Sequence, residues 1–293
     1  MEMQTFSPEN RLNELSAQEW LRFTKTWFIH NPSKRKKNEL LHPAKYPEVL
    51  IEEFIRFFTK EGQLVFDPFL GTGSTLVAAH NTKRNGIGIE LQQKYADMAQ
   101  GRIKVLEESS PSEKNKQVVI TGNSLEVVKI WKKQHFPKID FVITSPPYGP
   151  MLNKKGMASK IREEKGLDIK YSNDGADLGN AKSYEDFLMR VTTIFKTIKP
   201  HLKDEAYLVV ILQNYMDKGE YKMLAWDFAR EMNQHFQFRG ERIWCQDNKT
   251  LYPYGYRYSF VPNVHHHYCL IFKKVGKNYL PKVTNSATKS LSH

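Results

Sequence analysis

The chain has 293 residues, of which 40% are hydrophobic, so it can bury a substantial core, and both wholesale disorder and a fibrous repeat are excluded. Its 44 Lys and Arg residues outnumber its 32 Asp and Glu residues, and the resulting net charge of +12 favours a polyanionic partner, nucleic acid first and an anionic membrane surface second. The longest apolar run, Ala206 to Leu212, is much shorter than the roughly 20 residues of a membrane-spanning helix.

The start of the chain and its cysteines indicate the compartment. Residues 1–10 lack the basic and then apolar pattern of a signal peptide. Cys245 and Cys269 offer no disulfide framework and suit a reducing environment. We therefore expect a cytoplasmic protein without a membrane partner.

Residues 1–41 are interpreted as an N-terminal arm. An amphipathic stretch from Leu12 to Phe28 is followed by the basic run Lys34-Arg35-Lys36-Lys37, which is either a solvated surface or a set of contacts to phosphates. At the other end, residues 276–293 are rich in Lys, Ser, Thr and Asn and are typical of a flexible tail.

Between these ends, strands alternate with helices, which predicts a mostly parallel sheet with helices on both faces. The last two strands have no helix between them and are expected to pair antiparallel at one edge of the sheet. Two long loops, residues 149–181 and 246–262, interrupt the pattern, and loops of this length are usually functional. We expect one α/β domain over residues 42–275, with about seven strands. The expected strands are Leu64–Phe66, Gly86–Glu90, Val118–Thr121, Ile139–Thr144, Tyr207–Leu212, Glu241–Cys245 and His267–Lys273; the expected helices begin near Pro47, Ser74, Lys94, Tyr184 and Met223; and Trp131, Trp226 and Phe228 are expected in the core.

A glycine-rich corner, residues 67–75, follows the first of these strands. Gly71 and Gly73 let the backbone approach a ligand closely, and the N-terminus of the next helix supplies free N–H donors. Glu90 ends the following strand, where its carboxylate can accept hydrogen bonds from both hydroxyls of a ribose. Asp67 would repel a pyrophosphate, so S-adenosylmethionine, with its cationic amino-acid end, fits better than NAD or ATP. An ordinary strand-turn-helix corner is the alternative.

A proline-stiffened corner, Thr144-Ser145-Pro146-Pro147-Tyr148, follows a buried strand. Each proline fixes its own φ and lacks an N–H, so the carbonyls of Ser145 and Pro146 are available as acceptors. Acceptors beside an aromatic face suit a planar exocyclic amine, whose hydrogens are held while its ring is stacked. A rigid turn without chemistry is the alternative.

Both corners resemble motifs of the exocyclic-amino DNA methyltransferases, which act on cytosine N4 or adenine N6. Residues 67–73 resemble the cofactor motif, and residues 144–148 resemble the catalytic motif. Residues 42–47 resemble the segment that closes over the methionine end of the cofactor, and residues 122–124 resemble the turn beside the adenine ring. Residues 264–273 resemble the late strand that shapes the pocket for the target base. The likeness runs from about His42 to Lys274.

The resemblance implies an α/β, Rossmann-like class I methyltransferase fold that uses S-adenosylmethionine and requires no metal. It implies a catalytic group of Ser145, Pro146, Pro147 and Tyr148. The cofactor-binding residues that we expect are His42, Pro43, Asp67, Pro68, Phe69, Gly71, Gly73, Ser74, Thr75, Glu90, Asn123, Ser124 and Thr144. Contacts to nucleic acid are expected from Lys34, Arg35, Lys36, Lys37, Lys154, Lys155, Lys160 and Tyr254.

The residue at position 145 bears on the target base. Family members with Ser at this position tend to modify cytosine N4, whereas Asp or Asn goes more often with adenine N6, so Ser145 favours cytosine. Asn123 stands where the family commonly has Asp, and its amide oxygen leaves the contact to the adenine ring open. Only 71 residues separate Gly73 from Thr144, so we expect target reading to come from residues 34–37, 149–181 and 246–262 rather than from a large recognition domain.

The expected function is therefore a DNA methyltransferase that flips its target base, with DNA as its partner and a cognate restriction endonuclease left open. The alternatives are an adenine N6 or RNA methyltransferase of the same fold, or a catalytically silent nucleic-acid-binding module. The run His265-His266-His267 does not favour a metal site, because successive residues of a strand point to opposite faces. The tyrosines between Tyr252 and Tyr258 either stack on bases or pack on their own protein.

Overall fold

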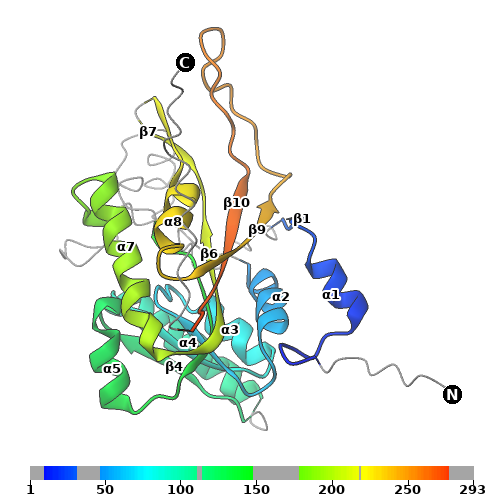
Figure 1. The fold of residues 1–293 in the computed structure, drawn as a ribbon, viewed down its shortest axis with the longest axis vertical. Helices are drawn as coiled ribbons and strands as arrows, with labels where there is room; N and C mark the ends of the chain where they lie inside the picture. The colour runs from blue at the N-terminus through cyan, green and yellow to red at the C-terminus, as the bar shows by residue number, and fades with distance from the viewer. Residues whose placement is uncertain (1–9, 32–46, 111–113, 148–177, 218, 277–293) are drawn as a thin grey trace, which may run out of the picture.

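A computed structural model describes residues 10–31, 47–110, 114–147, 178–217 and 219–276 (Figure 1). The main sheet has eight strands in the order β1-β9-β10-β6-β5-β2-β3-β4. Neighbouring strands run parallel except β10, which is antiparallel to both β6 and β9. The strands are β1 (Trp27–Ile29), β2 (Leu64–Asp67), β3 (Asn85–Glu90), β4 (Gln117–Thr121), β5 (Ile139–Thr144), β6 (Leu202–Leu212), β9 (Gln237–Cys245) and β10 (His266–Lys273), while β7 (Tyr215–Asp217) and β8 (Glu220–Lys222) form a separate hairpin.

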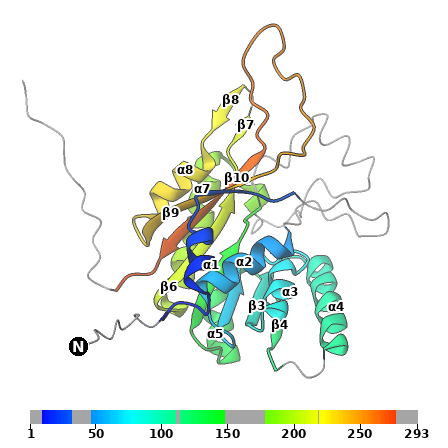
Figure 2. The same ribbon diagram turned by 90° about the vertical axis from the view of Figure 1, so that its right-hand side faces the viewer.

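Helices cover both faces of the sheet (Figure 2). On one face, α5 (Val127–Gln134), α7 (Tyr184–Ile198) and α8 (Leu224–Met232) enclose a core that includes Trp131 and Phe228. On the other face lie α1 (Ala17–Phe23), α2 (Glu48–Phe58), α3 (Ser74–Asn81) and α4 (Gln93–Ser109). Short 3-10 turns occupy Ser124–Glu126, Leu178–Asn180 and Lys199–His201. The predicted α/β class, the mostly parallel sheet and its two helical layers are confirmed.

The edge of the sheet differs from the prediction. The antiparallel strands β9 and β10 do pair, but β1 adds an eighth strand outside β9, with Trp27 opposite Ile243. A three-residue strand carries too short an alternation to be read from sequence. The expectation that Trp226 is a core residue is also wrong, because its side chain is 58% exposed at the outer surface of α8.

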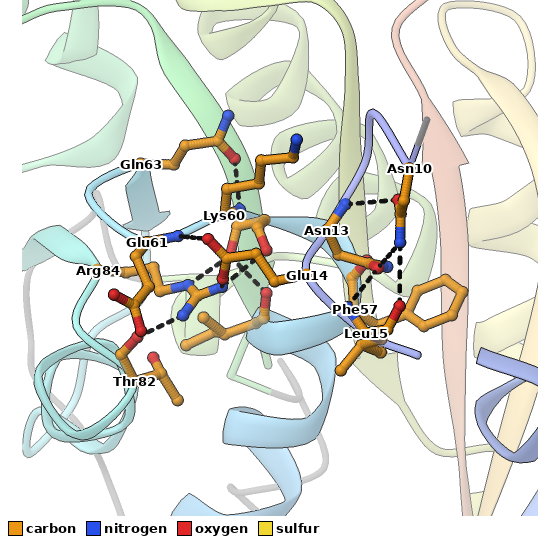
Figure 3. Close-up of polar contacts among 12 residues, drawn as sticks. Asn10, Asn13, Glu14, Leu15, Phe57, Lys60, Glu61, Gln63, Thr82 and Arg84 are labelled. Atoms are coloured by element: carbon orange, nitrogen blue, oxygen red, sulfur yellow. Dashed lines mark hydrogen bonds and ion pairs between the residues drawn. The ribbon is translucent and has the colours of Figure 1, made fainter. Parts of the chain in front are cut away.

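The described part of the predicted arm, residues 10–31, packs on the domain. Asn13 is buried and donates a 2.6 Å hydrogen bond to the carbonyl of Phe57 (Figure 3). Glu14 lies 3.1 Å from the guanidinium of the buried Arg84 and also accepts from the backbone N–H of Glu61. Polar contacts therefore fix this segment at the amino end of β2 before it continues to α1 and β1.

The chain order reverses between β2 and β5. From β2 the chain proceeds outward to β3 and β4, and it then returns to the other side of β2 as β5 and continues to β6. In open α/β sheets, ligands bind outside the carboxyl ends of the strands at this switch point. The two corners singled out in the sequence follow the carboxyl ends of β2 and β5, so both lie at the switch point.

Candidate active site

The two corners are joined by a hydrogen bond between side chains. The hydroxyl of Thr144 donates to Oδ1 of Asp67 at 2.6 Å, and the hydroxyl of Thr75 donates to Oδ2 at 2.5 Å. Oδ1 also accepts from the backbone N–H of Phe69. Since Asp67, Thr75 and Thr144 are all fully buried, the carboxylate acts as a fixed centre that positions β5, the turn after β2 and the first turn of α3.

The glycine-rich turn has the backbone shape that the motif requires. Gly71 and Gly73 have φ values of 56° and 88°, in the left-handed region that favours glycine. A Cβ built on Gly73 would lie 2.9 Å from the Cβ of Ala99, so glycine also allows α4 to approach the turn. Gly73 caps the N-terminus of α3, where backbone N–H groups lack partners within the helix.

Glu90 lies across from this turn at the end of β3. Its carboxylate accepts hydrogen bonds from the backbone N–H groups of Gly71 at 2.8 Å and Gln92 at 2.9 Å. These two bonds fix the orientation of the Glu90 carboxylate beside the turn. Glu90 is 9% exposed, which reduces competition from water.

A third strand end completes this half of the site. The hydroxyl of Ser124, just past β4, is buried and donates to the carbonyl of Pro68. Asn123 uses its side-chain oxygen to accept from the backbone N–H of Leu125, so it caps the short helix that follows. The ends of β2, β3 and β4 are therefore held together by polar contacts.

Arg102, which sequence reasoning did not select, supports the glycine-rich turn. Its guanidinium donates a 2.8 Å hydrogen bond to the carbonyl of Thr72 and pairs with Glu48 at the start of α2. Arg102 follows Ala99 by three residues on α4, so the position that packs on Gly73 and the position that reaches Thr72 share one helix face. This helical spacing is the signal that could have identified it.

On the other side of the switch point, the hydroxyl of Ser145 donates a 3.1 Å hydrogen bond to the carbonyl of Ile211 on β6. Ser145 and Pro147 are half-buried and Pro146 is buried. Because its proton is committed to Ile211, the Ser145 oxygen offers lone pairs to any further group. A hydroxyl held in this way has lone pairs that can accept a hydrogen bond from an N–H donor.

The strand after the long loop lies beside this corner. β10 pairs with β6, with Tyr268 opposite Leu212. His267 stacks on Trp244 with ring centroids 4.6 Å apart, and burial, aided by Lys249 and His266, lowers the pKa of His267 to about 3. His266 lies 3.2 Å from the hydroxyl of Tyr268. The described ranges contain no group of three or more His, Cys, Asp or Glu side chains that could hold a metal ion.

Several residues selected from the sequence lie outside the described part of the chain. They are Lys34, Arg35, Lys36, Lys37, His42, Pro43, Tyr148, Lys154, Lys155 and Lys160. Tyr254, by contrast, is described and is 54% exposed, on the loop between β9 and β10.

No helix among the described residues is long and apolar enough to cross a bilayer.

Comparisons with known proteins identify the family to which the chain belongs. Residues 3–101 and 139–293 match the N6/N4 methylase family model, described as DNA methylase. Among similar proteins are the type II methyltransferase M.BglI of Bacillus subtilis, 36% identical over 104 residues (36% of this chain, 29% of the relative), and the orphan methyltransferase M.BamHII of Bacillus amyloliquefaciens, 41% identical over 75 residues (26% of this chain, 28% of the relative). In these alignments the chain spans less than a third of each relative's length.

Solved structures show a looser likeness. A methyltransferase from Pyrococcus furiosus has a TM-score of 0.43 at 14% identity and covers 78% of this chain and 83% of its own. The family match, by contrast, includes both corners of the site and most of the chain. The chain belongs to the N6/N4 DNA methylase family, whose members are S-adenosylmethionine-dependent methyltransferases.

Proposed function

We propose that this protein transfers the methyl group of S-adenosylmethionine to an exocyclic amino nitrogen of DNA, with cytosine N4 as the favoured target. The observation that carries the proposal is the hydrogen bond from Thr144 to Asp67. This bond holds the glycine-rich corner, which suits a cationic nucleoside, against the proline-stiffened corner, which suits an exocyclic amine. The names of the relatives, which include type II methyltransferases, support DNA as the polymer.

The residues of the glycine-rich corner fit the cofactor. Glu90 presents a shielded carboxylate to the ribose hydroxyls, and the N-terminus of α3 offers N–H donors to a carboxylate. Within the described residues, the buried hydroxyl of Ser74 has no hydrogen-bond partner, which leaves it available to a polar ligand at this helix end. The carboxylate of Asp67 accepts hydrogen bonds from Phe69, Thr75 and Thr144. Its expected contact with the amino-acid end of S-adenosylmethionine stays a prediction.

The proline corner would hold the target. Its acceptors are the hydroxyl oxygen of Ser145, turned by its bond to Ile211, and the carbonyl of Pro146. By resemblance, Tyr148 supplies the face on which the flipped base stacks. Two acceptors on the two amino hydrogens pull the nitrogen toward a pyramidal geometry and expose its lone pair.

Bound S-adenosylmethionine would supply a methyl carbon activated by a positively charged sulfur. The chain's own contribution is to align the amine with that carbon and to exclude water, because the amine of cytosine is conjugated and weakly nucleophilic. As the N–C bond forms, the bond between the methyl carbon and sulfur would break, its electron pair would stay on sulfur, and S-adenosylhomocysteine would be left. The nitrogen then loses one proton to the Ser145 oxygen or to water. Ser145 in place of an acid favours cytosine, and adenine N6 and RNA remain the alternative targets.

Variants of the proline corner test this function. Pro146→Ala and Tyr148→Ala should abolish methyl transfer to plasmid DNA, while S-adenosylhomocysteine binds with unchanged affinity in calorimetry. Pro137→Ala is the matched control, because Pro137 is exposed and lies just before the amino end of β5, at the opposite end of that strand from the site. Full activity in the two site variants would refute the assignment. A cognate restriction endonuclease is a further part of the proposal, and resistance of the methylated plasmid to a panel of type II endonucleases would test it.

A further inference from the structure

Residues 246–262 make up most of the loop between β9 and β10 and expose a large amount of aromatic surface. It projects beyond the rest of the described chain as the orange loop in both views (Figures 1 and 2). Tyr258 is 93% exposed and Phe260 is 91% exposed. Four more large side chains on the same loop are also exposed, namely Leu251, Tyr252, Tyr254 and Tyr256.

The loop is braced by its own hydrogen bonds. Asn263 and Tyr252 exchange two hydrogen bonds, of 2.9 Å to the side-chain oxygen of Asn263 and 2.8 Å to the carbonyl of Tyr252. Gly255, with φ of 70°, accepts from the backbone N–H groups of Tyr258 and Ser259. Its base is tied to the body, where the side chain of Asn31 donates to Asp247. The aromatic side chains are therefore presented on a shaped loop, which lowers the entropy that binding would cost.

The position of the loop links it to the site. Its second strand, β10, pairs with β6, and Ile211 of β6 accepts the hydrogen bond from Ser145. The loop leaves β9 after Cys245 and enters β10 at His266, at the same end of the sheet at which β6 finishes. A polymer whose base reaches Ser145 would thus pass the foot of this loop.

The chemistry of the loop favours a nucleic acid over another protein or a lipid surface. Its one acidic residue, Asp247, is engaged by Asn31, while Lys249 and Arg257 leave it positively charged. Aromatic rings stack on every base, and tyrosine hydroxyls tolerate nearby phosphates and water. Single exposed apolar side chains are common, but six large ones gathered on one loop indicate an interaction site.

We propose that the loop inserts the rings of Tyr258 and Phe260 between stacked bases of duplex DNA, beside the base that is extruded toward Ser145. This inference rests on the proposed function and names the part of the chain that opens the stack. The inserted rings replace the stacking that the extruded base gives up, so they lower the cost of flipping. The same insertion unwinds the duplex locally.

Unwinding provides a test that does not depend on the recognition sequence. Nicked plasmid is sealed by ligase in the presence of the full-length protein and S-adenosylhomocysteine, and the topoisomers are compared after the protein is removed. Wild type should shift the distribution, and Tyr258→Ala/Phe260→Ala should not. The double variant should also raise the KM for plasmid DNA roughly tenfold or more, as expected when base-stacking rings are lost, while the KM for S-adenosylmethionine is unchanged.

Three further variants separate ring stacking from general hydrophobicity and from loss of structure. Tyr258→Phe/Phe260→Tyr keeps both rings and should behave as wild type, whereas Tyr258→Leu/Phe260→Leu should behave as the alanine variant. Met189→Ala removes an exposed apolar side chain from α7 and should have no effect.

A double alanine variant with wild-type topoisomers and wild-type KM for DNA would overturn the inference. So would a leucine variant that matches wild type, or a loop variant whose only change is in self-association measured by sedimentation. If wild type methylates no DNA at all, the proposed function fails first. If wild type methylates DNA and the loop variants do so equally well, the proposed function stands and only the proposed insertion of Tyr258 and Phe260 fails.

Discussion

The hydroxyl of Thr144 donates a 2.6 Å hydrogen bond to the carboxylate of Asp67, which ties the last residue of β5 to the last residue of β2. Both side chains are fully buried, so the bond is shielded from water. Because these strands flank the switch point of the sheet, the bond sets the relative position of the two corners of the site.

Removing this hydroxyl should loosen both corners. Thr144→Val keeps the shape of the side chain and deletes the donor, so we expect a loss of about 1–3 kcal/mol in the free energy of unfolding, measured with urea. The affinity for S-adenosylhomocysteine and the rate of methyl transfer should fall together. Thr144→Ser retains the donor and should stay close to wild type, and a valine variant with normal stability and activity would show that the link is dispensable.

Ser145 should matter for turnover rather than for cofactor binding. Ser145→Ala removes the acceptor that the bond to Ile211 orients, and we expect kcat to fall about tenfold to hundredfold with unchanged affinity for S-adenosylhomocysteine. The control is Ser109→Ala, which removes an exposed serine that also donates to a backbone carbonyl, that of Leu106. Equal effects of the two substitutions would argue against a role for Ser145 in catalysis.

Glu90 should act mainly on cofactor affinity. Glu90→Gln leaves one acceptor oxygen for two backbone donors and removes the negative charge, so we expect S-adenosylhomocysteine to bind about tenfold to hundredfold more weakly in calorimetry. The exposed Glu108→Gln, on α4, removes the same charge far from the turn and should bind normally. Unchanged affinity in Glu90→Gln would mean that the ribose hydroxyls are held elsewhere.

The first residues of the described chain should stabilise the domain through Arg84. Glu14→Gln leaves the buried guanidinium without its carboxylate, and because the Glu14 side chain is half-exposed we expect a moderate loss of about 1–2 kcal/mol in the free energy of unfolding. Glu126→Gln breaks the solvent-exposed pair with Lys129, and its free energy of unfolding should stay close to that of wild type. If urea titrations show that Glu14→Gln and Glu126→Gln lower the free energy of unfolding equally, the burial of Arg84 does not strengthen its pairing with Glu14.

His267 should make stability depend on pH. Burial lowers its pKa in the folded state to about 3, below the ordinary value of 6.5, so the unfolded chain takes up this proton first as the pH falls. The histidine therefore costs stability from about pH 6.5 downward, by up to about 1.4 kcal/mol per pH unit.

His267→Phe keeps an aromatic ring against Trp244. Between roughly pH 6 and pH 4, it should reduce the slope of the unfolding free energy against pH by the amount that corresponds to the uptake of about one proton on unfolding. Urea titrations at several pH values measure the slope. If the slope of His267→Phe equals that of wild type, His267 is protonated in the folded state.

The sequence was sufficient to predict the strand ends that carry the site. Asp67 and Glu90 each end a strand of strong apolar pattern, and parallel strands bring such residues to one edge. It also placed the tyrosines between Tyr252 and Tyr258 on a loop, but it left open whether they stack on bases or pack on their own protein; the structure shows them exposed.

Other features depend on contacts between distant segments. The strand β1 forms because Trp27 to Ile29 meet β9, more than 200 residues away, and its own pattern is too short to predict. Trp226 is apolar yet exposed, since α8 buries Leu224, Ala225 and Phe228 instead and places Trp226 outward against the edge of Tyr268. The orientation of the Ser145 hydroxyl depends on Ile211 of β6, and no local signal could have revealed it.

The most direct test is mass spectrometry of nucleosides after plasmid DNA has been incubated with the protein and S-adenosylmethionine that carries a deuterated methyl group. The juxtaposition of Asp67 and Ser145 across the switch point predicts trideuterated N4-methylcytosine in the DNA, which should be lost in Ser145→Ala/Pro146→Ala. Labelled N6-methyladenine would support the assignment of the active site but would contradict cytosine as the target base. The absence of label from DNA, with S-adenosylhomocysteine still bound by the protein, would contradict the proposed reaction itself.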